Sequence, residues 1–148
     1  MDQGKRPPEI RAIPRHQRVL LAVLGVVLAG LLVLARLLTP SPTDMGTHQE
    51  LGLPPCSFRV LFGLPCPTCG MTTAWAHLVR GELLAAVRAN CGGLLLGVLA
   101  ALAVPWSLVS AGRGRWTGWT PHEATAGWTA AGLLILILLQ WAWRLWMR

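Results

Sequence analysis

A short stretch, L-P-C-P-T-C-G-M-T-T, has residue types and a spacing suited to chemistry, because only two residues separate the thiols of Cys66 and Cys69. Pro65 and Pro67 fix the backbone angle φ and lack N–H donors. Gly70 can adopt the left-handed conformation that closes a tight turn. The sequence therefore predicts a turn in which two sulfur atoms face one point.

Helix-forming residues follow this turn from Met71 to Arg80, with Thr68 or Thr72 available as an N-cap. Cys69 is then expected close to the first turn of a helix. The free N–H groups and the positive end of the helix dipole favour a thiolate there over a thiol. A thiolate is the reactive species both in metal binding and in disulfide exchange.

Three interpretations of the cysteines stay open. A zinc knuckle needs four ligands, and Cys56 is the candidate third ligand, with Cys91 or His48 as the fourth. A dithiol/disulfide couple would use Cys66 and Cys69, although no βαβ pattern of the thioredoxin type surrounds them. The remaining interpretation is a re-entrant turn shaped by proline and glycine, with or without a plain disulfide.

The composition predicts a membrane protein. The 148 residues are 53% hydrophobic and only 13% charged, whereas soluble domains carry about 25% charged residues. Runs of about 20 apolar residues are long enough to cross a hydrocarbon core of about 30 Å. We predict an all-α membrane protein with three transmembrane helices and a short interfacial or re-entrant helix after the Cys-Pro-x-Cys-Gly turn.

The expected organisation follows the alternation of apolar and polar stretches. Within the second span, Gly93 and Gly97 form a Gly-x-x-x-Gly face that allows close helix approach, matched by Gly25 and Ala29 in the first span. The predicted segments are a basic cytoplasmic arm (1–18), the first transmembrane helix (19–38), a polar loop (39–55), the cysteine-motif region with its interfacial helix (56–90), the second transmembrane helix (91–110), a loop (111–125) and the third transmembrane helix (126–146).

The net charge of +7 does not indicate nucleic-acid binding, because the basic residues flank apolar runs instead of alternating with stacking aromatic residues. Arg80 and Arg88 are expected to lie at the interface or to contact an anion such as a lipid headgroup. Seven basic residues fall on the N-terminal side of the predicted topology and five on the opposite side. The positive-inside rule then places the N-terminus in the cytoplasm and the cysteine motif outside it. The seven are Lys5, Arg6, Arg11, Arg15, Arg18, Arg113 and Arg115, and the five are Arg59, Arg80, Arg88, Arg144 and Arg148.

The order of these motifs resembles the domain of unknown function 2752 family, a group of small bacterial membrane proteins. The resemblance rests on Cys56, the Cys-Pro-x-Cys-Gly-Met-Thr core, the Arg-Gly-Glu-Leu that starts at Arg80, and Ala-Asn ending at Asn90. It implies a bacterial inner (plasma) membrane and a shared site built on Cys56, Cys66 and Cys69. The family's usual Arg after the motif is Thr73 here, and the usual Pro after the Asn is Cys91. The resemblance implies no activity.

No constellation of acid and base residues indicates an enzyme, and His122-Glu123 lacks the second His of a zincin motif. We therefore expect a non-catalytic membrane component whose cysteine cluster organises a surface loop through a zinc-like metal or a disulfide. One alternative is a membrane thiol–disulfide oxidoreductase that uses Cys66 and Cys69. Another is a small subunit of a transporter or membrane complex, which would need a homo-oligomer or a membrane-protein partner because three helices enclose little space.

Overall fold

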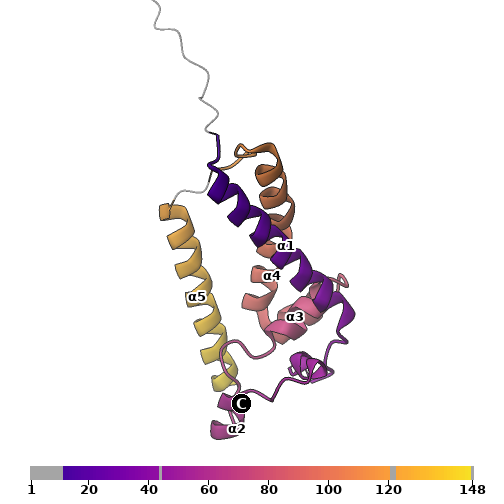
Figure 1. The fold of residues 1–148 in the computed structure, drawn as a ribbon. Helices are drawn as coiled ribbons and strands as arrows, with labels where there is room; N and C mark the ends of the chain where they lie inside the picture. Colours follow the sequence, from indigo (N-terminus) through magenta and orange to yellow (C-terminus); the bar gives the residue numbers. More distant parts are fainter. Residues whose placement is uncertain (1–11, 44, 121–122, 148) are drawn as a thin grey trace, which may run out of the picture.

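The computed structural model describes residues 12–43, 45–120 and 123–147, and in these parts every regular element is helical (Figure 1). Three of the helices are long and apolar enough to cross a membrane, so the predicted fold class is confirmed. The elements in chain order are α1 (Arg15–Leu37), the 3-10 helix η1 (Thr47–Leu51), α2 (Ser57–Phe62), α3 (Met71–Leu78), α4 (Leu83–Arg113) and α5 (Glu123–Trp146).

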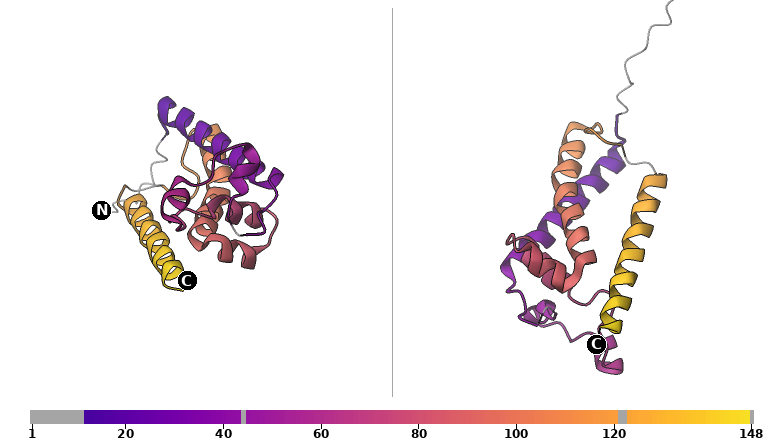
Figure 2. Two further views of the ribbon diagram at one scale, coloured as in Figure 1. Left: turned by 90° about the horizontal axis from the view of Figure 1, so that it is seen from below. Right: turned by 180° about the vertical axis from the view of Figure 1, so that it is seen from behind.

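The long helices give the molecule two distinct ends (Figures 1 and 2). At one end the beginning of α1 meets the end of α4: the Ile13 N–H donates to the Gly114 carbonyl at 2.9 Å. Beside it, Arg18 Nε donates to the Ala111 carbonyl at 2.9 Å. The short elements η1, α2 and α3 lie toward the opposite end, where α2 is next to the C-terminal end of α5. The cysteine turn and the Arg113 loop therefore occupy opposite ends.

The first helix begins earlier than the apolar run predicts. It starts at Arg15 instead of Val19, directly after Pro14. Proline fits a helix start because an N–H group at this position would make no hydrogen bond within the helix. Arg15 and Arg18 therefore belong to the helix and not to the predicted arm. Residues 1–11 of that arm, like Pro121 and His122, lie outside the described residues.

The short helix α3 packs between α1 and α4 and uses the glycine face of α4. A Cβ added at Gly93 would lie 3.1 Å from the Met71 Cα, and one at Gly97 would lie 2.6 Å from Leu78 Cδ2. Trp75 Nε1 also donates to the Gly93 carbonyl at 2.9 Å. The Gly-x-x-x-Gly face thus allows close approach as predicted, but its partner is α3 and not the first span.

Gly25 of α1 instead packs against Ser107 and Leu108, in the C-terminal part of α4. A Cβ added at Gly25 would lie 2.7 Å from Ser107 Oγ and 2.6 Å from Leu108 Cδ2. The helices α3 and α1 therefore pack against different parts of α4: α3 on Gly93 and Gly97, and α1 on the part near Ser107.

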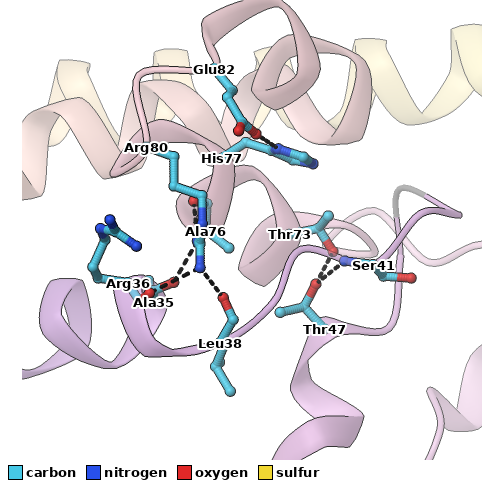
Figure 3. A network of polar contacts seen from close by, with 10 residues as sticks. All are labelled: Ala35, Arg36, Leu38, Ser41, Thr47, Thr73, Ala76, His77, Arg80 and Glu82. Atoms are coloured by element: carbon cyan, nitrogen blue, oxygen red, sulfur yellow. Dashed lines mark hydrogen bonds and ion pairs between the residues drawn. The ribbon is translucent and has the colours of Figure 1, made fainter.

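Arg80, just after α3, holds the C-terminal end of α1 (Figure 3). Its Nη1 donates to the Ala35 carbonyl at 3.2 Å. Its Nη2 donates to the carbonyls of Arg36 at 2.9 Å and Leu38 at 2.6 Å. The last carbonyls of a helix have no partner within the helix and attract cations. Arg80 thereby ties α3 to α1, and its anion-contacting role stays a prediction.

Replacing Gly93 by Val tests the close packing of α3 on α4. The added side chain would enter space held by Met71 and Ala74, and overpacking of this kind costs about 1–3 kcal/mol. Thermal unfolding in detergent micelles should show a lower Tm for Gly93→Val. The matched control is Gly30→Val in α1, where an added Cβ meets nothing within 4 Å. An equal loss of stability in both variants would contradict this packing.

Candidate metal centre

Three cysteines converge at the end of the molecule that carries the short helices. The sulfur atoms of Cys56, Cys66 and Cys69 all lie within 4.8 Å of one another. The two sulfurs of the Cys-Pro-x-Cys turn are 3.0 Å apart. The Cys66 N–H donates to Cys69 Sγ at 3.2 Å. All three thiols are half-buried and free.

Two glycines shape the chain so that these sulfurs meet. Cys56 stands immediately before α2, and α2 ends at Gly63, whose φ of 67° is in the left-handed region. The chain then reverses and passes through the Cys66–Cys69 turn to Gly70. This glycine has a φ of 88° and stands immediately before the first residue of α3. Side chains with a Cβ rarely adopt this conformation, so glycine is needed at both positions.

Asn90 fixes the turn to the second spanning helix. Its backbone leaves the helical region (φ −168°, ψ 109°) and divides α4 into two helical parts. Its Oδ1 accepts the N–H of Gly93 at 2.7 Å, which is the geometry of an N-cap. Its Nδ2 donates to the carbonyls of Pro67 at 3.3 Å and Cys69 at 3.2 Å. The side chain is fully buried, so one amide joins the cysteine turn to the start of the membrane helix.

The last spanning helix holds the same turn from the other side. Trp141 Nε1 donates to the Pro65 carbonyl at 2.7 Å. Arg144 Nη1 donates to the Cys69 carbonyl at 3.1 Å. The other arm of this guanidinium donates to the carbonyls of Arg88, at 2.8 Å, and Ala89. Side chains from α4 and α5 thus donate hydrogen bonds to carbonyls along the cysteine turn, from Pro65 to Cys69.

The surroundings give the three thiols different acidities. The backbone N–H of Arg59 lowers the pKa of the Cys56 thiol from 9.0 to about 7, against an opposing effect of burial. Burial, with the nearby Cys66 side chain, raises the pKa of the Cys69 thiol to about 12. Three thiolates this close together would repel one another unless a cation lay between them. The cluster therefore favours either retained protons or a bound cation.

A cavity of about 370 Å³ adjoins the cluster and is lined by all three cysteines and by His48. His48 therefore shares the cavity with the thiols, although its ring is not in the group of ligand atoms within 4.8 Å. Cys91, the other predicted fourth ligand, is absent from both the cluster and the lining among the described residues. Arg88 is exposed and does not line the cavity.

Sequence reasoning missed the residues that hold the turn. These residues are Asn90, Trp141 and Arg144, and nothing in their local sequence points to a loop 20 or more residues away. One signal was available: a polar Asn directly before an apolar run is an N-cap pattern. The tryptophan and arginine carry no such signal, since both types are common at membrane interfaces.

Residues 56–104 match a family model described as Protein of unknown function (DUF2752). This match confirms the resemblance predicted from the motifs, and it includes the three cysteines and Asn90. No curated protein and no solved structure matches the chain.

Changing Asn90 to Ala should loosen the cysteine turn. The change removes an N-cap and two hydrogen bonds from a buried site, which together cost about 2–3 kcal/mol. We expect a lower Tm and faster alkylation of the motif thiols by a maleimide. Asn90→Ser is the matched variant, because a serine can still cap the helix but lacks the amide that holds the turn. It should keep most of the stability yet show the faster alkylation. Unchanged alkylation in both variants would contradict the proposed link.

Proposed function

We propose that this chain is a non-catalytic integral membrane protein in which a thiophilic, zinc-like metal ion bound by Cys56, Cys66 and Cys69 organises the surface loop. The observation that carries the proposal is the convergence of three sulfurs within 4.8 Å. A disulfide would join only two of them and leave the third cysteine without a role. A metal ion uses all three.

The spacing of the sulfurs fits such an ion. Zinc binds thiolates at about 2.3 Å in a tetrahedral arrangement, so two of its sulfur ligands lie about 3.8 Å apart. The Cys66 and Cys69 sulfurs are 3.0 Å apart and no pair in the cluster exceeds 4.8 Å, so shifts of about an ångström would suffice. The N–H group that Cys66 donates to Cys69 Sγ is the kind of outer contact that supports a ligating thiolate.

The bound ion would join two segments of the chain. Cys56 stands immediately before α2, whereas Cys66 and Cys69 precede α3. Joining them would close the 56–69 loop on itself, and Asn90, Trp141 and Arg144 would hold that loop against the two spanning helices. We infer a structural centre that fixes a rigid loop at the membrane surface, where a second copy or another membrane protein could bind.

We propose that the cysteine end faces away from the cytoplasm of a bacterial cell, in the inner (plasma) membrane. Arg15, Arg18, Arg113 and Arg115 lie at the opposite end, where α1 begins and α4 ends. Basic residues near the first span usually decide its orientation, and they favour the cytoplasmic side.

Purification of the full chain in detergent without a chelator tests the metal centre. We expect about one metal ion per chain by elemental analysis, since a three-thiolate site holds one ion. Changing Cys56, Cys66 or Cys69 to Ser should remove most of it. Cys91→Ser is the matched control, because this free cysteine lies outside the cluster, and it should retain the full amount. A metal-free wild-type chain with three freely reactive motif thiols would contradict the proposed metal centre.

The second candidate, a thiol–disulfide oxidoreductase, is favoured by the 3.0 Å between the Cys66 and Cys69 sulfurs. In that reaction the Cys66 thiolate attacks a protein disulfide and releases one partner thiolate. Cys69 then attacks the mixed disulfide, so the partner leaves as a dithiol and this chain becomes the disulfide. A Cys69→Ser variant would then trap a mixed disulfide. The metal centre predicts no such adduct.

Labelling of intact cells tests the orientation separately. After chelation and reduction, a membrane-impermeant maleimide should modify Cys66 and Cys69 from outside. A chain whose only thiol is introduced by Thr120→Cys, in the loop at the other end, should be modified only after the cells are permeabilised. The reverse pattern would place the cysteine end in the cytoplasm.

A further inference from the structure

We propose that His48 is the fourth ligand of this centre, so that the ion is held by three thiolates and one imidazole. The inference rests on the proposed function, since it completes the same site. Zinc in structural centres is almost always four-coordinate, and three cysteines with one histidine is an established ligand set. The three sulfurs leave one position to be filled.

The residues that line the cavity show which side chain can take the fourth coordination position. About 370 Å³ of space lies against the three cysteines, and His48 lines it together with Arg59. Zinc takes its protein ligands from cysteine, histidine and carboxylate groups. Among the described residues the lining contains no carboxylate and no histidine besides His48. A turn of this ring into the cavity would bring a nitrogen to the open side of the cluster.

The helix that carries His48 is anchored at the adjacent residue (Figure 3). The hydroxyl groups of Thr47 and Thr73 are hydrogen-bonded at 2.8 Å, and both side chains are buried. Thr47 Oγ1 also accepts the N–H of Ser41 at 3.0 Å. Thr73 belongs to α3, which begins two residues after Cys69. The backbone of η1 is thus fixed to the element that positions the cysteine turn.

The ends of η1 leave the rest of this segment room to adjust. Gly46 before it has a φ of 100°, and Gly52 after it has a φ of 73°. Glycine adopts these angles without strain. His48 follows the anchored threonine by one residue and is half-buried at the wall of the cavity that the three cysteines also line. The anchor therefore holds the histidine backbone beside the cavity, and its ring is the part that would turn toward the sulfurs.

Charge also favours a neutral ligand. A divalent ion with three thiolates carries one net negative charge, and a fourth anionic ligand would raise this to two. A neutral imidazole keeps it at one, and Arg59 at the wall of the same cavity can offset that charge. The arrangement suits a closed structural centre, in which no position remains for a reacting water.

Cobalt(II) substitution of the full chain in detergent micelles tests the inference, because cobalt reports its ligands in its absorption spectrum. The variants are His48→Ala, His48→Cys and the control Gln49→Ala, whose side chain lines the same cavity from the same helix. In wild type we expect sulfur-to-cobalt charge transfer and tetrahedral ligand-field bands. His48→Ala should shift the ligand-field bands, leave the charge-transfer intensity unchanged and weaken cobalt binding at least about tenfold.

His48→Cys should instead raise the charge-transfer intensity, because a fourth sulfur joins the ion, and Gln49→Ala should match wild type. If wild type shows charge transfer and neither His48 variant changes the spectrum, the assignment of His48 is overturned and the three-cysteine centre stands. If wild type shows no charge transfer at all, the proposed function itself fails. A Gln49→Ala effect equal to that of His48→Ala would also overturn the assignment.

Discussion

A membrane helix that begins inside the protein needs partners for its first N–H groups, since no water is available there to supply them. Here the second part of α4 begins at Asn90, and the side chain of that residue accepts the Gly93 N–H at 2.7 Å. The same amide donates to two carbonyls of the cysteine turn. The requirement for a cap within the protein thus places the turn at the helix start, and the position of the sulfurs depends on it.

Arginines satisfy carbonyl groups at two further helix ends. Arg80 donates to carbonyls at the end of α1, and Arg144 donates to the carbonyls of Arg88 and Ala89 before the break in α4. Each of these cations lies where the helix dipole is negative, which stabilises the contact. Because Arg144 also binds the Cys69 carbonyl, the break in α4, the C-terminal part of α5 and the cysteine turn form one connected structure. A metal centre at that point would strengthen contacts that the polypeptide already makes.

Apolar runs and glycine and proline positions predicted much of this molecule. The three long helices and the short helix after the cysteine turn follow from length and hydropathy, because hydrocarbon excludes unsatisfied backbone. The convergence of Cys56 with the Cys66–Cys69 pair was also a hypothesis from the sequence. Which helices pack together, and which cysteines come together, was harder to predict. The glycine face of α4 receives α3 instead of α1, and Cys91 lies outside the cluster, because both depend on contacts between distant segments that leave no local pattern.

X-ray absorption at the metal edge of the natively purified chain tests the central claim most directly, because it reports the atoms around the ion itself. The account predicts one zinc-like ion with about three sulfur neighbours at about 2.3 Å and one nitrogen neighbour at about 2.0–2.1 Å. A chain that carries no metal, or a metal whose neighbours are only oxygen and nitrogen, would contradict it.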